Sequence, residues 1–333
     1  MKLGRHADTF QHKDDRKIDV SISQPPGSCV GKNSCASYNG PTSISEAMGA
    51  SFWLAGMWLI VVAFLTLTAE QWPLPEYDHM DWLHQAAVPG TESRVPVKDS
   101  DRETKETAFV YLLGTDTMGR DIVTRLIFGA RVSLTVGLAS PCIGMVIGGI
   151  LGMLAGFYRG RLDAFIVVTM DALLAFPALV LLIVITFYLG SSLGNIIFIM
   201  GFLSIPHFSR VARANTLTFA EREFVQSARM LGQTDFSIII REILPNIIMP
   251  LIVYALLVVS YMIVAEGTLS FLGLGVPAPT PSWGGMIAEG KEVLDEAPHI
   301  SLLPALILFL TVLSFNIIGD SLKRVLDSKE GQL

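Results

Sequence analysis

Residues 172–209 read ALLAFPALVLLIVITFYLGSSLGNIIFIMGFLSIPHFS and contain no Asp, Glu, Lys or Arg over 38 positions. About 20 apolar helical residues cross a hydrocarbon core about 30 Å thick, so this stretch is too long for one span. The glycine, serine and asparagine cluster at 190–195 divides it. The stretch therefore predicts a hairpin of two membrane-spanning helices, the third and fourth of the chain.

The composition of the whole chain is also that of a membrane protein. Of its 333 residues, 51% are hydrophobic and 16% are charged, whereas a soluble domain carries about 25% charged residues. The net charge of −6 provides no basic face, so no nucleic acid is expected among the partners. The spacing of the cysteines Cys29, Cys35 and Cys142 indicates neither a disulfide framework nor a zinc-type pair. The composition predicts a chain whose partner is the lipid bilayer.

Four more apolar runs flank the hairpin and bring the expected number of membrane spans to six. The first, 47–69, has no charged residue in 23 positions and is too long for a cleavable signal sequence. The second lies between Arg131 and Arg159, and the fifth and sixth cover 245–267 and 297–319. The expected fold is an all-α integral membrane protein with six transmembrane helices.

The polar segments between the runs give the expected domain boundaries. Residues 1–46 combine prolines, glycines and mixed charge, which predicts a disordered polar tail. Residues 70–130 contain four prolines that exclude a long helix, so an extramembrane segment is expected there. The transmembrane core is expected over 131–322, with a loop at 214–244, and a short tail follows at 323–333.

The placement of lysine and arginine orients the chain. Basic residues follow the second, fourth and sixth spans, whereas the connection after the fifth span carries only Lys291 and that after the third carries none. Because cytoplasmic loops carry the excess of basic residues, both termini and the 214–244 loop are expected in the cytoplasm. The 70–130 segment is then extracytoplasmic, and its basic residues do not contradict this because the rule weakens for loops of about 60 residues.

The loop between the fourth and fifth spans reads TFAEREFVQSARMLGQTDFSIIIREILPN from Thr218 to Asn246. Apolar residues at three- and four-residue steps predict one face of a short helix, made of Leu217, Ala220, Phe224, Ala228 and Leu231. Gly232 is expected to end this helix, and a second short helix over 235–244 leads to Pro245. Such a helix either lies flat on lipid or protrudes to meet another protein, and periodicity alone leaves both open.

This loop resembles the signature loop of ABC importer permeases. In that family a Glu-Ala-Ala triplet is followed after three residues by glycine and further on by Leu-Pro. The matching positions here are Gln226, Ser227, Ala228, Gly232, Leu244 and Pro245. Gln226 replaces the family's glutamate and cannot form its ion pair, and Glu242 replaces an isoleucine. The resemblance implies that these residues, with Phe224, form the coupling-helix loop gripped by separate ATP-hydrolysing subunits.

Further motifs resemble one branch of that family, the second permease of dipeptide, oligopeptide and nickel importers. They are LGTD at 113–116, GRD at 119–121, MDALLAFP at 170–177, LSFLGLG at 269–275 and PSWG at 281–284. The resemblance implies a bacterial inner-membrane permease for di- or oligopeptides, with nickel or another small solute as the alternative. It also implies a second homologous permease, two ATP-binding subunits that hold ATP and magnesium, and an extracytoplasmic substrate-binding protein.

Charged and proline residues within the spans are candidates for the translocation path. Asp171 is expected to tie helices together rather than to touch substrate, because an intramembrane aspartate needs a partner or a cavity. Phe176 and Pro177 are expected to kink the third span, since proline removes a helix hydrogen bond. Glu266, at the outer end of the fifth span, is expected either to reach water or to face the incoming solute.

The stretch from Gly114 to Asp121 is dense in turn formers and polar groups, ahead of a short amphipathic segment. It is expected to form a loop and an interfacial helix that lead into the second span. The alternative is part of an outer rim where a binding protein docks, formed by Gly114, Asp116, Gly119, Arg120 and Asp121.

No catalytic residue, metal site or bound cofactor is expected in this chain. It contains no HExxH motif, and its two Gly-Lys pairs lack the rest of a phosphate-binding loop, so it should not hydrolyse ATP itself. Two other functions stay open: a secondary transporter driven by an ion gradient, and a membrane anchor without transport. Secondary transporters usually hold several ionisable groups at membrane depth, whereas Asp171 and Glu266 are the clear candidates here.

Overall fold

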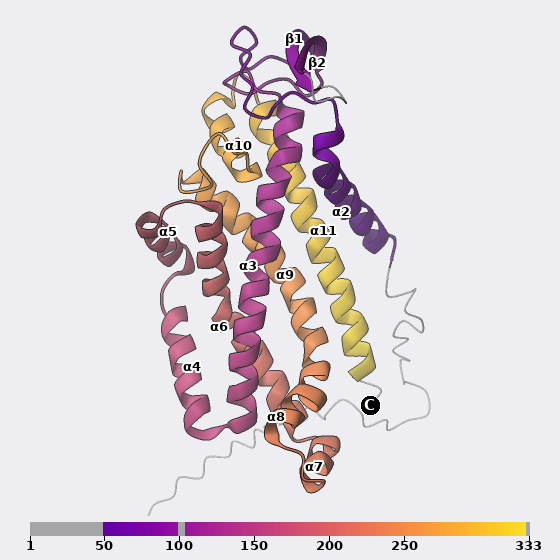
Figure 1. The fold of residues 1–333 in the computed structure, drawn as a ribbon, viewed down its shortest axis with the longest axis vertical. Coiled ribbons are helices and arrows are strands. Elements are labelled where there is room, and N and C mark those ends of the chain that lie inside the picture. Colours follow the sequence, from indigo (N-terminus) through magenta and orange to yellow (C-terminus); the bar gives the residue numbers. More distant parts are fainter. Residues whose placement is uncertain (1–48, 99–103, 331–333) are drawn as a thin grey trace, which may run out of the picture. The chain divides into compact units, whose positions relative to one another are not determined.

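The computed structural model describes residues 49–98 and 104–330, so the predicted tail at 1–46 lies outside the described part of the chain. Long helices make up most of the described part (Figure 1). The helices of eight or more residues are α2 (Ala50–Thr68), α3 (Ile122–Tyr158), α4 (Gly160–Leu174), α5 (Ala178–Leu189), α6 (Leu193–Ala220), α7 (Glu223–Met230), α9 (Leu244–Phe271), α10 (Trp283–Gly290) and α11 (His299–Glu330). Two strands, β1 (Thr91–Lys98) and β2 (Thr104–Tyr111), lie at one end of the helix bundle and α7 lies at the other. We call these the hairpin end and the α7 end.

Five helical segments of the described residues are long and apolar enough to cross a membrane. They contain α2, α3, α6, α9 and α11. The sixth expected span is present only as a broken one, because α4 and α5 pass the same test together but are bent by 83°. The break falls at Phe176 and Pro177, where the sequence predicted a kink. Proline has no amide hydrogen and disfavours helical geometry in the residue before it, so the two helices separate here.

Close packing of α3 against α6 forms the centre of the bundle. Small residues let the two backbones approach, because a Cβ placed on Gly148 would lie 2.5 Å from the carbonyl oxygen of Ile205. A Cβ on Gly152 would collide with the carbonyl oxygen of Ser209. Helices in lipid associate mainly through such packing, since lipid tails are as apolar as the side chains they would replace.

The second membrane helix starts earlier than predicted. The sequence placed a loop and a separate interfacial helix before Arg131, whereas α3 runs unbroken from Ile122. Asp121 caps it by accepting a hydrogen bond from the backbone N–H of Thr124 at 2.8 Å. Helix α3 continues through Arg131. The guanidinium of Arg131 donates to Glu70, just after the C-terminal end of α2, at 2.9 Å, so its charge has a partner.

The extramembrane segment expected between the first two membrane helices contains a β-hairpin, a small non-helical part of a mostly helical fold. Strands β1 and β2 pair antiparallel, with Val95 opposite Thr107. Val95, Val97 and Tyr111 are buried together between the hairpin and the loops beside it. Valines at alternate positions place both side chains on one face of a strand, which is the pattern of a half-buried hairpin.

The last helix continues beyond its expected end. The sequence placed the end of the sixth span at 319 and a tail at 323–333, whereas α11 extends to Glu330. Residues 321–326 contain no proline or glycine, and helices commonly leave the bilayer without a break when nothing stops them.

Candidate functional site

The segment between α6 and α9 folds into a compact projection at the α7 end (Figure 1). We call residues 221–243 the elbow. The single amphipathic helix expected over 217–231 is wrong, because α6 ends at Ala220 and α7 begins at Glu223. Arg222 between them has an extended backbone, which interrupts the helical ladder.

This interruption changes which residues of α7 are buried. Val225 and Ala228 are 0% and 4% exposed and pack into the main core, whereas Phe224 is 39% exposed and Leu231 is 81% exposed. Both of the latter were expected on the same apolar face as Ala228. A turn between two helices shifts the angular phase of the second, so the period that began at Leu217 does not continue into α7.

The end of α7 is fixed by a glycine in the left-handed conformation. Gly232 has φ +79°, and the backbone N–H of Gln233 donates to the carbonyl oxygen of Ala228 at 3.1 Å. Left-handed geometry at this position lets the next backbone N–H groups bond to the free carbonyl groups at the helix end. Glycine adopts this geometry most readily. The chain then turns sharply into the next helix.

The second helix of the elbow does not stop before Pro245 as expected. The short helix α8 (Asp235–Ile238) passes through a π turn, Ile239–Ile243, directly into α9. The Leu244 N–H donates to the carbonyl oxygen of Ile239, five residues back. A proline in the first turn of α9 cannot donate and would crowd the carbonyl four residues before it, and a wider π turn relieves this crowding.

The elbow presents an exposed apolar surface on a buried base. Ile238 and Ile243 are 0% exposed and join the main core, so the elbow is held firmly to the bundle. Facing away from it, Met230 is 81% exposed and Phe236 is 75% exposed. We call the set Phe224, Met230, Leu231 and Phe236 the crest. Several exposed apolar side chains on one short projecting segment are typical of a protein docking site.

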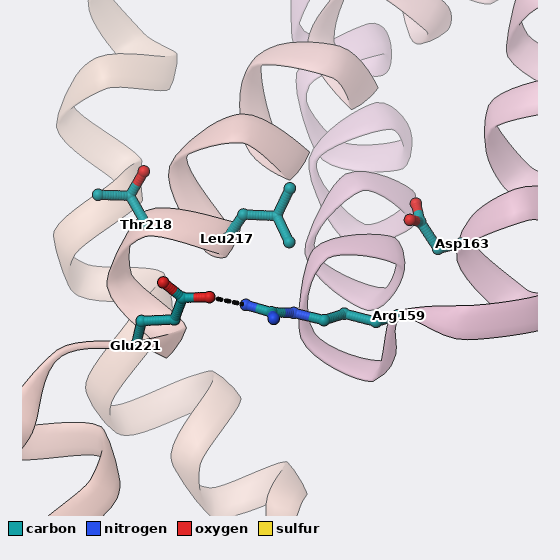
Figure 2. Close-up of a pocket in the computed structure, with 5 residues that line it drawn as sticks. All are labelled: Arg159, Asp163, Leu217, Thr218 and Glu221. Atoms are coloured by element: carbon teal, nitrogen blue, oxygen red, sulfur yellow. Dashed lines mark hydrogen bonds and ion pairs between the residues drawn. The ribbon is translucent and has the colours of Figure 1, made fainter.

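An open hollow of about 370 Å³ lies beside the elbow, between the α3–α4 turn and the last turn of α6. Figure 2 shows five residues that line it. Arg159 and Glu221 point toward one another across it, and the guanidinium donates to the carboxylate at 2.7 Å. Leu217 and Thr218 of α6 line the same hollow, with Asp163 of α4 on its far side. Both charged side chains of the pair are about half exposed or more, so the pair fastens the elbow to the α3–α4 turn only weakly.

Except for two, the residues predicted for the coupling loop are exposed. Gln226, Ser227, Gly232 and Pro245 are exposed, whereas Ala228 is buried and Leu244 is half-buried. The Gln226 side chain donates to the backbone carbonyl oxygen of Glu221 at 3.1 Å. It therefore stabilises the turn before α7 in place of an ion pair.

Asp171 pairs with a cation of a neighbouring helix. Arg210 of α6 donates to its carboxylate at 2.6 Å, which links α4 to α6. The two side chains are 51% and 58% exposed. Phe176, at the α4–α5 break, is 61% exposed.

Glu266 neither reaches water nor faces an opening, contrary to both expectations. Its side chain is 0% exposed and accepts hydrogen bonds from Ser133 of α3 at 3.0 Å and Ser270 of α9 at 2.7 Å. The Ser133 hydroxyl also accepts from the backbone N–H of Trp283 at 3.2 Å. Glu266 thus joins α3, α9 and the start of α10.

The polar stretch Gly114–Asp121 is buried rather than exposed as a rim. Asp116 and Arg120 are each 1% exposed, and Asp121 is 3% exposed. The Arg120 guanidinium donates to Asp116 at 2.6 Å and to Glu289 of α10 at 2.7 Å. Gly114 and Gly119 have positive φ values, because the loop makes tight turns around this pair.

Arg125 and Glu289 complete this cluster, and sequence reasoning missed both. Arg125 is 2% exposed and donates to both carboxylate oxygens of Glu289, at 3.0 and 3.2 Å. An arginine inside a helix that is otherwise apolar was the available signal, because a buried charge requires a partner. Nothing in the sequence placed that partner 164 residues further on.

A second polar cluster holds the β-hairpin to the loop after α2. Asp81 accepts hydrogen bonds from Ser93 at 2.6 Å, His84 at 2.8 Å and Tyr111 at 3.2 Å. Burial raises the pKa of the Asp81 carboxyl, but hydrogen bonds from Ser93 and His84 outweigh it and hold this pKa below its ordinary value. Burial, reinforced by the nearby Asp81 charge, raises the pKa of Tyr111 well above its ordinary value.

A bundle of apolar helices that carries a projecting, firmly based elbow defines the class of the protein, a multi-pass membrane permease. Residues 148–331 match the family described as the binding-protein-dependent transport system inner membrane component. The chain belongs to this family.

Curated relatives agree with the family match. The chain is 40% identical over 231 residues to the glutathione transport system permease protein GsiD of Pectobacterium atrosepticum, covering 69% of this chain and 77% of the relative. A Brucella suis protein with the name "Putative peptide transport system permease protein BRA1093/BS1330_II1085" is 42% identical over 219 residues. These residues make up 66% of this chain and 74% of the relative. A solved structure of the methionine ABC transporter MetNI is similar at 16% identity, with a TM-score of 0.49 over 60% of this chain and 97% of that one.

Proposed function

We propose that this importer permease carries short peptides inward and that separate ATP-hydrolysing subunits drive it by gripping the elbow. The observation that carries the proposal is the exposed crest on a buried base. Leu231 is 81% exposed, whereas Val225, also in the elbow, is 0% exposed. A surface that is apolar outside and rigid inside can receive a partner and pass its movement to the bundle.

The peptide substrate is supported by the relatives. Two curated proteins of at least 40% identity are named for glutathione and for peptide transport. Glutathione is itself a tripeptide, so both names describe the same chemical class. Nickel or another small solute is the alternative, and a competition assay with peptides separates the two.

The partners follow from the same proposal. A second homologous permease would complete the translocation path beside this chain, because six spans are few to enclose it. Two ATP-binding subunits would hold ATP and magnesium, and an extracytoplasmic binding protein would deliver the peptide at the hairpin end. The α7 end and both termini would then face the cytoplasm of a bacterial cell, as the basic residues near the α7 end favour.

Transport would alternate between outward-open and inward-open states. ATP binding can shift this equilibrium only through contacts that differ between the states. The elbow is suited to such contacts because α8 runs into α9 and Arg159 meets Glu221 at its base. Movement of the crest would then be passed to the membrane helices.

The test is extraction of the tagged chain in mild detergent, identification of subunits that purify with it, and an ATPase assay. We expect two ATP-binding subunits and a sister permease, with hydrolysis stimulated by a peptide-loaded binding protein. Replacing Met230 and Leu231 together by glutamate should release the ATP-binding subunits, because two carboxylates would be buried without partners in the interface.

The matched control is Leu112→Glu. Leu112 is 69% exposed and lies next to β2, away from the elbow, so this variant should keep the subunits. A chain that purifies alone, and transports under an ion gradient without ATP, would instead be a secondary transporter.

A further inference from the structure

The four charges that join α10 to the start of α3 are balanced only while Glu289 is in place. Arg120 and Arg125 bring two positive charges, and Asp116 supplies one negative charge, within 2.6 Å of Arg120 and 3.3 Å of Arg125. These three side chains are each 2% exposed, so water does not screen them. Withdrawal of Glu289 would therefore leave two buried guanidinium groups that share one contacting carboxylate, Asp116.

Glu289 is the accessible member of the cluster. Its side chain is 32% exposed, and it lies near the end of α10. A contact made from outside can therefore reach Glu289 but cannot reach the arginines beneath it. The carboxylate is placed to respond to events at the hairpin end.

Arg125 is not fully bonded in this arrangement. Within the described part of the chain, no acceptor forms a hydrogen bond with its Nε or its Nη1. Buried donors without acceptors are unfavourable, so the arrangement is less stable than a fully bonded one would be. A second arrangement, in which the Glu289 carboxylate or another acceptor shifts, is therefore energetically accessible.

Helix α10 also contacts α3 and α9, which run to the α7 end. Trp283 is 0% exposed, and its indole N–H donates to the carbonyl oxygen of Leu126 in α3 at 3.0 Å. Gly284 lies so close to Gly267 of α9 that a Cβ would collide with it. A change in the position of α10 would therefore alter its contacts with both α3 and α9.

We propose that Glu289, held by Arg120 and Arg125, is a releasable lock that keeps α10 seated and restrains ATP hydrolysis until a binding protein docks at the hairpin end. Glu289 is then a positioning residue for coupling. The inference rests on the proposed importer function and adds the point at which the external partner acts.

The first measurement needs only the chain in its membrane. Ala288 is half-buried on α10, so a cysteine there, in a background with Cys29, Cys35 and Cys142 replaced by serine, reports how tightly α10 is seated. In Glu289→Gln, labelling of this cysteine by a membrane-impermeant maleimide should be about tenfold faster, a change equivalent to about 1.4 kcal/mol. The control is Glu292→Gln, which removes an exposed carboxylate from the same end of α10 and should leave the rate unchanged.

The second measurement is ATP hydrolysis by the assembled complex in the absence of any binding protein. Glu289→Gln should raise it severalfold, whereas a merely structural defect would lower it. Unchanged labelling in Glu289→Gln overturns the lock. Faster labelling with unchanged hydrolysis overturns its role in coupling and leaves the importer function intact.

Two further outcomes are kept distinct. If no ATP-binding subunit purifies with the chain, the proposed function and the coupling role fail together, while the labelling rate still decides whether the lock exists. If Glu289→Gln does not assemble, Glu289→Asp keeps the charge and shortens the side chain. It should then give intermediate labelling and hydrolysis, and wild-type values for both would refute the proposal.

Discussion

Arg213 of α6 holds Asp163 of α4 through two parallel hydrogen bonds, from Nε to Oδ1 at 2.5 Å and from Nη2 to Oδ2 at 2.7 Å. Such a fork requires the planar guanidinium, because the ammonium of lysine is a single point of charge. Arg213→Lys should therefore lower the stability of the purified protein by about 1 kcal/mol, since the pair is only partly buried. Thermal unfolding in detergent measures this. Arg161→Lys, at an exposed position of the same helix as Asp163, is the control and should have no effect.

The contact between α3 and α6 should not tolerate a larger residue. Gly152→Leu would drive a side chain against the backbone of Ser209, at an expected cost of about 3 kcal/mol or more. The variant should be degraded or aggregate when it is expressed in membranes, as measured by the yield of monodisperse protein. Gly56→Leu in α2 is the matched control, because nothing lies within 4 Å of a Cβ placed there. Equal yields of the two variants would contradict this account of the packing.

The backbone of Gly232 should matter more than the space around it. A Cβ at Gly232 would meet nothing within 4 Å, but its φ of +79° is unfavourable for residues with a side chain. Gly232→Val should cost about 1–2 kcal/mol locally, tilt α7 and reduce ATP-driven peptide uptake. Gly232→Asn should retain uptake, because asparagine tolerates the left-handed region. If valine and asparagine behave alike in a vesicle uptake assay, the turn is not what positions the crest.

The β-hairpin should be anchored most firmly between acid and strongly alkaline pH. The folded pKa of Asp81 lies below its ordinary value of 3.8, so the anchoring is present above that pH and is lost as pH falls through the folded pKa. Tyr111 has a raised pKa, so its neutral form is favoured in the fold and the anchoring weakens as pH rises above the ordinary value of 10.0.

Removal of the Asp81 charge should lower the pKa of Tyr111 toward its ordinary value. Ultraviolet titration of Asp81→Asn against the wild-type protein should show one tyrosine ionising at lower pH than in the wild type, because part of the repulsion is gone while the burial remains. Tyr111→Phe in both backgrounds identifies the residue concerned. An unchanged titration curve would mean that burial alone keeps Tyr111 neutral.

The sequence predicted the features that depend on neighbouring residues. The apolar runs predicted the long helices, Pro177 predicted the break in the third span, and Gly232 predicted the end of α7. Each is a local effect of helix length, of a missing amide hydrogen or of a permitted backbone angle. The valines of β1 carried a readable alternation as well, but the prolines nearby indicated only that no long helix forms there.

The features that the sequence did not predict depend on tertiary contacts or on angular phase. The two-residue turn before Glu223 rotated α7, so Val225 packs beside Ala228 in the core while Phe224, expected on the same face as Ala228, is 39% exposed. The bonds of Arg125 to Glu289 join residues that no local pattern relates. The burial of Glu266 likewise required a serine on α3 and the start of α10.

The π turn at Ile239–Ile243 gives the chain one residue more than an α-helix would need between the elbow and α9. Deletion of a single residue there should turn it into an ordinary α-helical stretch, provided that the crowding at Pro245 is relieved by Pro245→Ala. A π turn closes with a bond five residues back instead of four, so it takes up the extra residue within one turn, and the crest would keep nearly the same direction about the axis of α9. The chain could thus gain or lose one residue at this point without re-aiming the docking surface, which makes the turn a natural place for related permeases to differ in length while keeping the same partner.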